Sequence, residues 1–169
     1  MRSVGHMKAA FEMMTERVQS RFTQGEQLAQ KQIVQEMIAD AWITIEQTRL
    51  LVMQTAWKID RLQNYRAVRK DIAASKIAAA RALVDVASKA LQIHGSLGIT
   101  QEMPFVSMIV NGIHVGLADG PSEIHKLTFA RDLLRDVEPS PGLWPTQHIP
   151  ALVDEARSLY AEALTRHGR

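Results

Sequence analysis

The sequence predicts an all-α protein, a bundle of helices with an extra helix at its C-terminus. Apolar residues recur at three- and four-residue steps through most of the chain, which is the period of one helix face. No segment shows the two-residue alternation of a half-buried strand. A chain of 169 residues, with 46% hydrophobic and 22% charged residues, is an ordinary globular protein of one domain with at most a short appendage.

Two helices are predicted in the first 60 residues. The first has an apolar face made of Val4, Met7, Ala10 or Phe11, Met14 and Val18. Residues 23–25, Thr-Gln-Gly, interrupt the pattern. It resumes in a helix of about eight turns, with the spine Ile33, Met37, Ala41, Ile45, Thr48, Val52, Thr55 and Ile59. Such a helix needs neighbours that cover its stripe, and Trp42 and Trp57, on or near this face, are expected in the core.

A short corner at residues 62–65 leads into the third predicted helix. Its spine is Ile72, Lys76 or Ile77, Ala80, Leu83 or Val84, Ala87 and Leu91. Many further alanines favour the helix and permit close packing against neighbours. Gly95 and Gly98 end it, because glycine adopts the left-handed backbone found where helices stop.

Two shorter helices are predicted next. Thr100 is expected to cap the fourth, which has Pro104 in its first turn and runs to about Val110. Residues 111–116 are predicted to be a poor helix, because they contain two glycines. The fifth helix starts at Pro121 and runs to about residue 135.

The chain ends in a segment of different composition. Four prolines between residues 139 and 150 mark an extended linker, and residues 151–166 form an amphipathic helix. We therefore predict a helical bundle over residues 1–136, followed by a Pro-rich linker and terminal helix over residues 137–169.

Composition excludes several classes of function. The chain has no cysteine, which excludes disulfides and thiol catalysis, and its six histidines lack the spacing of metal ligands, so no metal is expected. No apolar run is long enough to span a membrane, and no signal peptide precedes the first helix. We therefore expect a soluble, cytoplasmic protein.

The charge pattern does not predict a nucleic-acid partner. The net charge is +2, and basic residues are interspersed with acidic ones. The densest basic patch consists of Arg61, Arg66, Arg69 and Lys70, and it is interpreted as a solvated corner between helices.

The segment Ala118-Asp119-Gly120-Pro121-Ser122-Glu123-Ile124-His125 is the most informative part of the chain. An acid just before a helix that starts with proline is usually a cap, and Glu123 could reach back to the Gly120 N–H as in a capping box. The alternative is a general base, with Asp119 exposed on a turn where Gly120 leaves room for a substrate. The residues alone leave both readings open.

Two other segments are equally ambiguous in isolation. The run 92–98, Gln-Ile-His-Gly-Ser-Leu-Gly, is a helix-terminating turn and no dinucleotide fingerprint, because no strand precedes it. Arg21 lies in the last turn of the first helix, where a cation suits the helix dipole.

Taken together and in order, these segments resemble the C-terminal helical domain of the acyl-CoA dehydrogenases over about residues 1–136. The branch of that family whose active-site loop reads Ala-Asp-Gly-Pro is the most similar. The resemblance implies an antiparallel helical bundle, FAD as cofactor, an acyl-CoA substrate and a role in fatty acid β-oxidation. It also implies a homo-oligomer, or a partner that carries the family's N-terminal and middle domains.

The resemblance assigns roles to particular residues. Asp119 matches the carboxylate that removes the substrate α-proton, and Gly120 matches a backbone contact to the substrate. The remaining positions match FAD contacts: Pro121, Ser122 and Glu123 at the flavin, Arg21, Phe22 and Thr23 with Gln32 nearby at the diphosphate, and Gln92, Gly95 and Ser96 at the adenosine half.

Several positions depart from the family pattern. Gln24 stands where phenylalanine usually precedes the glycine, Ser96 replaces the second glycine of the adenosine turn, and Ile113 and Gly116 replace arginines. Met1 matches an internal position of the family, which suggests a longer ancestral frame. The expected function is thus the C-terminal domain of an FAD-dependent acyl-CoA dehydrogenase that needs a partner. The alternative is a non-catalytic oligomerisation or regulatory module, or a truncated remnant of that enzyme.

Overall fold

The computed structural model of the protein describes residues 1–167. The chain divides into two compact units, Met1–Leu133 and a second unit that begins at Leu134. Each unit is described by itself.

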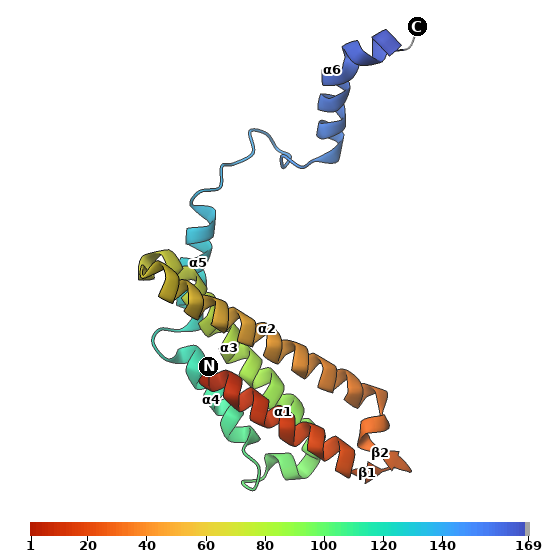
Figure 1. The fold of residues 1–169 in the computed structure, drawn as a ribbon, viewed down its shortest axis with the longest axis vertical. Coiled ribbons are helices and arrows are strands. Elements are labelled where there is room, and N and C mark those ends of the chain that lie inside the picture. The colour runs from red at the N-terminus through yellow and green to blue at the C-terminus, as the bar shows by residue number, and fades with distance from the viewer. Residues whose placement is uncertain (168–169) are drawn as a thin grey trace. The chain divides into compact units, whose positions relative to one another are not determined.

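The first unit is a helical bundle, which confirms the predicted fold class (Figure 1). Its helices are α1 (Arg2–Ser20), α2 (Gln32–Leu62), α3 (Tyr65–His94), α4 (Phe105–Leu117) and α5 (Ser122–Leu134). Short 3₁₀ segments occupy Leu28–Gln30 and Gly95–Ile99. Helix α3 is the central element, because it packs against α1, α2 and α4.

The core follows the predicted apolar faces of α1 and α3. Met7 and Met14 of α1 are fully buried, as the helical spacing predicts. On α3, Leu83 and Ala87 are buried beside Phe105 of α4. The small side chains of α3 let three neighbouring helices approach its backbone, which explains why this alanine-rich segment lies at the centre.

The expected burial of two tryptophans in α2 is wrong. Trp42 is 54% exposed and Trp57 is 63% exposed, while Ala41, Ile45 and Thr55 of the same helix are buried. One residue corresponds to about 100° around a helix, so Trp42 points away from the face that carries Ala41. Helix α2 therefore has a buried stripe and a separate exposed apolar surface.

A small hairpin interrupts the helices where the pattern breaks at residues 23–25. Strand β1 (Phe22–Thr23) pairs antiparallel with β2 (Glu26–Gln27). The turn between them has positive φ at Gln24 (53°) and Gly25 (85°), as a tight two-residue hairpin turn requires. The sequence shows the break but not the hairpin, because two-residue strands are too short for any alternation.

Helix α4 differs from the prediction at both ends. It continues past Val110, through the predicted poor segment, to Leu117. Gly112 is buried against α3, where a Cβ would lie 2.6 Å from Cγ2 of Val84, so the glycine serves close packing and does not break the helix. Thr100 does not cap α4, since its hydroxyl donates to the carbonyl of Leu97 at 2.7 Å.

The second unit contains a linker and helix α6 (Ile149–His167), which matches the predicted terminal helix closely. In the linker, the ring of Trp144 stacks on His148 with their centroids 4.6 Å apart. The hydroxyl of Ser140 donates to the carbonyl of Trp144. These contacts give the Pro-rich segment local order.

Candidate functional site

The loop between α4 and α5 presents Asp119 to solvent. Both Asp119 (φ 52°) and Gly120 (φ 95°) adopt the left-handed backbone, which glycine and, less readily, aspartate tolerate. The Asp119 side chain is exposed, and its carboxylate has no hydrogen bond or ion pair with any described residue. The carboxylate is therefore free to act on a ligand.

The capping interpretation of this loop does not hold. The first turn of α5 is closed by the carbonyl of Pro121, which accepts from the N–H groups of Ile124 (3.0 Å) and His125 (3.2 Å). Glu123 does not form the capping box within the described chain, and its carboxylate lies 3.9 Å from Lys126 Nζ. Ser122 donates to the carbonyl of Gly116 at 3.0 Å and thereby joins the two helices.

Two side chains bind the backbone of this loop. Lys76, on α3, donates from Nζ to the carbonyls of Ala118 and Gly120. His125, on α5, has Nε2 3.2 Å from the carbonyl of Asp119. Three successive carbonyls, at residues 118–120, therefore each have a side-chain partner.

The hairpin end of the bundle carries a second set of predicted residues. Arg21 and Phe22 are exposed, and the Arg21 guanidinium has no ion pair or hydrogen bond among the described residues. Thr23 is half-buried, and Gln32 is exposed at the first position of α2. Lys31, the residue before α2, makes no side-chain cap. The free N–H groups at the start of α2 therefore give a positive helix end beside the hairpin.

The turn after α3 forms as predicted. Gly95 ends the helix with φ 63°, and its N–H donates to the carbonyl of Gln92. Gln92, Gly95 and Ser96 are all exposed, and nothing lies within 4 Å of the position a Gly95 Cβ would take. The turn is therefore an open backbone surface that a flat ligand can approach.

The site residues that the sequence predicts form two groups in the structure, one at the Asp119 loop and one at the hairpin and the Gly95 turn. Arg17 and Ser20, at the end of α1, line one cavity with His94 and Leu97, so the hairpin and the Gly95 turn share an end of the bundle (Figure 1). The 19 residues of α3 from Lys76 to Gly95 span about 28 Å. The Asp119 loop is therefore distant from the group formed by Arg21, Phe22, Thr23, Gln32, Gln92, Gly95 and Ser96.

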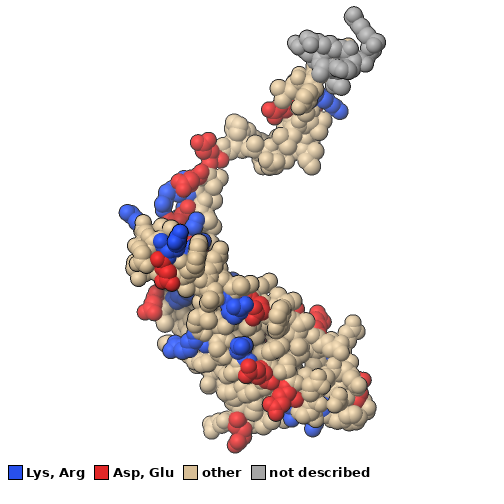
Figure 2. Space-filling model, viewed as in Figure 1, with Lys and Arg blue, Asp and Glu red and all other residues tan. Residues whose placement is uncertain are grey.

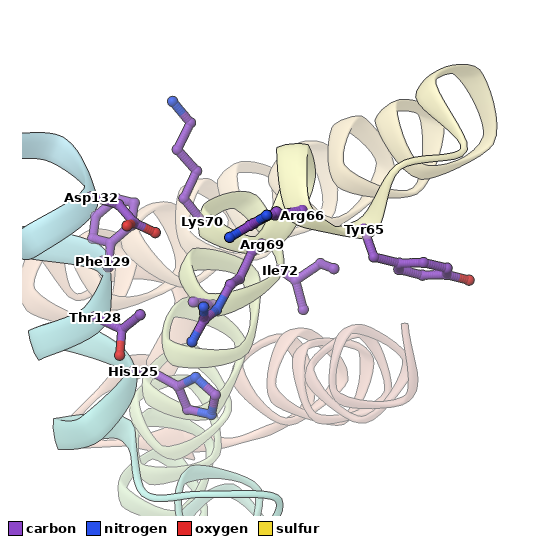
Figure 3. Close-up of a pocket in the computed structure, with 10 residues that line it drawn as sticks. Tyr65, Arg66, Arg69, Lys70, Ile72, His125, Thr128, Phe129 and Asp132 are labelled. Atoms are coloured by element: carbon purple, nitrogen blue, oxygen red, sulfur yellow. The ribbon is translucent and has the colours of Figure 1, made fainter. Parts of the chain in front are cut away.

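A cavity of about 390 Å³ lies between the first half of α3 and α5. Figure 3 shows Arg69 extending from α3 toward His125 of α5, with Thr128 beside it, while Lys70 and Tyr65 point away. The cavity adjoins the Asp119 loop, because His125 lines the cavity and also contacts the carbonyl of Asp119. Cations on one wall suit an anionic ligand.

Sequence reasoning missed the roles of three of these residues. Lys76 was counted among the apolar spine of α3, although a lone cation in an alanine-rich stripe is a signal that it has a polar partner. Arg69 was interpreted as part of a solvated corner. His125 ends the informative segment at residues 118–125, but the sequence predicts no role for it.

Other classes of site are not found in the described part of the chain. No cluster of three or more His, Cys, Asp or Glu residues there could hold a metal ion. None of the helices that were described is long and apolar enough to cross a membrane. Figure 2 shows Lys and Arg interspersed with Asp and Glu on the visible face of the molecule, in place of a single basic stripe.

Comparison with known proteins identifies similar chains. The family model described as "Acyl-CoA dehydrogenase, C-terminal domain" matches residues 1–134. The chain is 40% identical over 136 residues to acyl-CoA dehydrogenase family member 11 of Gallus gallus, covering 80% of this chain and 17% of that protein. It is 40% identical over 134 residues to (R)-benzylsuccinyl-CoA dehydrogenase of Thauera aromatica, covering 78% of this chain and 32% of that protein.

The solved structures that are similar to this chain also include acyl-CoA dehydrogenases. A putative acyl-CoA dehydrogenase from Mycobacterium abscessus is similar with a TM-score of 0.76 and 35% identity, covering 79% of this chain and 33% of that one. Butyryl-CoA dehydrogenase from Megasphaera elsdenii has a TM-score of 0.73 and 26% identity, covering 79% and 34%. The chain thus spans between about a sixth and a third of the length of these proteins.

Proposed function

The chain belongs to the acyl-CoA dehydrogenase family, in which it corresponds to the C-terminal domain, and from that premise we propose that it supplies the catalytic carboxylate of an FAD-dependent dehydrogenation of an acyl-CoA thioester. The rest of the active site would come from domains outside these 169 residues, on a partner or on a longer polypeptide. We further propose that this activity is cytoplasmic, which the absence of cysteine allows.

The observation that carries the proposal is the unengaged carboxylate of Asp119 on a fixed, exposed loop. A carboxylate without internal partners can accept a proton from a carbon next to a thioester carbonyl. Gly120, next to it, lets the substrate approach the backbone closely. The flavin, when bound, accepts the β-hydride of the substrate.

The residues at the hairpin and the Gly95 turn fit the nucleotide part of FAD. The free guanidinium of Arg21, the positive end of α2 at Gln32 and the exposed ring of Phe22 suit a diphosphate attached to an aromatic base. Thr23, Gln92 and Ser96 add exposed polar groups, and Gly95 adds an open backbone. Pro121, Ser122 and Glu123, beside Asp119, would contact the flavin end.

The distance along α3 favours a site shared between two copies of the chain. Lys76, which binds the Asp119 loop, lies about 28 Å from Gly95 along that helix. We propose that the Asp119 loop serves the flavin of one FAD, while the Gly95 turn of a second copy serves its adenosine half. This proposal accounts for a homo-oligomer, or for assembly with a partner that carries the remaining domains.

The cavity between α3 and α5, called here the cationic cavity for Arg66 and Arg69 on its α3 wall, suits the nucleotide end of the acyl-CoA substrate. The thioester would lie at Asp119, beside Lys76, and Arg69 and Arg66 follow on α3 at about 10 and 15 Å from Lys76. Guanidinium groups bind phosphate oxygens in a bidentate manner. The pantetheine arm would bridge the distance along the helix, so that one chain contacts both ends of the substrate.

The proposal is tested by producing the chain together with the family's N-terminal and middle domains. We expect a yellow complex that oxidises an acyl-CoA, and Asp119→Asn should reduce kcat by at least a thousandfold while leaving flavin absorbance unchanged. Asparagine tolerates the left-handed backbone of this position, so the variant keeps the fold. Full activity of Asp119→Asn would disprove the assignment of the base.

A second candidate function is a non-catalytic oligomerisation or regulatory module. The exposed apolar residues of α2, among them Trp42, Met53 and Trp57, favour it because contiguous apolar surface marks an interaction site. Ile113 and Gly116 also favour it, because these uncharged residues stand where the family pattern has arginines. Titration of the chain with FAD, alone and with the missing domains, separates the candidates, since binding of flavin in neither case supports the module.

A further inference from the structure

The loop that carries Asp119 is anchored by packing on one side only, because α4 before it packs on α3. Helix α5, which follows it, has no buried residue among Ser122–Leu134. Both Asp119 and Gly120 have a positive φ, a backbone that is strained for aspartate and persists only where its surroundings impose it. Something other than an apolar core must therefore fix this conformation.

The hydrogen bond from Ser122 to the carbonyl of Gly116 closes the loop at its ends, and side-chain hydrogen bonds from two helices hold the residues between them. Lys76 on α3 binds the carbonyls of Ala118 and Gly120, and His125 on α5 contacts the carbonyl of Asp119 from the other side. A cation that donates to two carbonyls forms charge-assisted hydrogen bonds, which are about twice as strong as neutral ones. With all three carbonyls engaged, the Asp119 carboxylate remains free to face a ligand.

We infer that Lys76 and His125 are positioning residues that hold Asp119 in the orientation needed for proton abstraction. The inference rests on the proposed function of Asp119 as a base. Both side chains bind backbone carbonyls of the loop and not the Asp119 carboxylate. Each acts through the backbone, and a base displaced by about 1 Å can lose a hundredfold in rate.

The structural test uses the isolated chain labelled with ¹⁵N. In the wild type, the amides of Asp119 and Gly120 should have order parameters near ~0.85, as rigid backbone does. Lys76→Met should lower them below ~0.6, and Lys76→Arg should restore them, because a guanidinium can donate to two carbonyls. Lys89→Met is the matched control, since Lys89 lies on the same helix and pairs with Asp85 at the surface.

His125→Ala provides a second variant in case Lys76→Met does not fold. It removes the contact to the Asp119 carbonyl from a half-buried position and should mobilise the same two amides. Unchanged order parameters at Asp119 and Gly120 in a folded Lys76→Met or His125→Ala protein would overturn the inference.

The functional test uses the complex with the remaining domains. Lys76→Met should lower kcat about a hundredfold without changing the Kd for acyl-CoA, and Lys76→Arg should recover most of the loss. An equal loss in Kd, or no recovery with arginine, would contradict a positioning role. If the wild-type complex is inactive, the proposed function fails, while the order parameters of the isolated chain still decide whether Lys76 and His125 fix the loop.

Discussion

Lys76, on α3, binds the carbonyl of Gly120, in the loop that follows α4. The same ammonium group binds the carbonyl of Ala118, so α3 holds the peptide group before Asp119 and the peptide group after Gly120. Helix α3 also carries one wall of the cationic cavity and ends at the Gly95 turn. One central helix thus sets the positions of three regions that the proposed function uses.

Gly112 should be intolerant of alanine because α4 packs closely on α3. A Cβ at this position would lie 2.6 Å from Cγ2 of Val84 and 3.1 Å from the carbonyl of Ala80. The β-branched Val84 cannot easily rotate away, so Gly112→Ala should lower the free energy of unfolding by about 1–3 kcal/mol.

Gly5→Ala is the matched control for that measurement. Gly5 lies in α1 with nothing within 4 Å of its Cβ position, so the variant should gain about 0.5–1 kcal/mol from helix propensity alone. Urea denaturation of both proteins checks the pair. Stabilisation in both variants would show that α3 and α4 are not in close contact at Gly112.

Thr55 and Ser75 should be energetically coupled, because their buried hydroxyl oxygens lie 2.6 Å apart and join α2 to α3. Ser75→Ala should cost about 1 kcal/mol, since the Thr55 hydroxyl keeps its bond to the carbonyl of Leu51. Thr55→Val should cost about 1–3 kcal/mol, because it leaves the Ser75 hydroxyl without this partner.

A double-mutant cycle measures the coupling. The combined variant should be less destabilised than the sum of the single variants by about 0.5 kcal/mol or more. Strict additivity would mean that the hydroxyl contact contributes nothing to the packing of α2 on α3.

Glu46 should make stability depend on pH in the acid range. The bidentate hydrogen bonds from Arg49 lower the pKa of Glu46 below its ordinary value of 4.5, and desolvation opposes this effect only in part. A carboxyl whose folded-state pKa is depressed stabilises the protein above its unfolded pKa, and this contribution is lost as the pH falls through the folded-state value.

The variant Glu46→Gln isolates this effect. The difference in unfolding free energy between wild type and Glu46→Gln should be largest above pH 4.5 and should shrink as the pH is lowered below it. Glu36→Gln, at an exposed position of the same helix, is the matched control for the removal of one carboxylate. A difference for Glu46→Gln that stays constant between pH 6 and pH 3, measured by urea titration, would contradict the assignment.

The sequence predicts the bundle where burial and helical period agree. Met7 and Met14 lie on one predicted face and are buried, because α1 packs on other parts of this chain. The same reasoning wrongly predicts that Trp57 is buried, since an apolar side chain on a long helix can also pack against a partner outside the 169 residues. Gly112 is a second exception. Helix propensity predicts a weak helix there, but the close packing of Gly112 on Val84 is a tertiary contact, which local propensity does not describe.

The candidate site also has one part that the sequence predicts and one part that only the structure shows. Motif resemblance identifies Asp119 and the Gly95 turn, because these residues are adjacent in sequence and have recognisable neighbours. Lys76 and His125 act through backbone carbonyls on a loop brought to them by folding. A cation in an alanine-rich stripe indicates that Lys76 has a polar partner, but the sequence does not say which carbonyls folding brings to it.

Arg69 should be a principal binding residue for the phosphates of CoA. Its guanidinium extends toward His125 in the cavity between α3 and α5, and a lost charge-assisted hydrogen bond costs about 1.5–3 kcal/mol. Arg69→Gln should therefore weaken the binding of CoA to the chain by roughly 10- to 100-fold in isothermal titration calorimetry. Arg61→Gln, in the last turn of α2 and outside the cavity lining, should bind CoA like the wild type. Equal affinities for the wild type and Arg69→Gln would exclude this cavity as the phosphate site, and equal losses in both variants would indicate only a diffuse attraction between the basic surface and the anion.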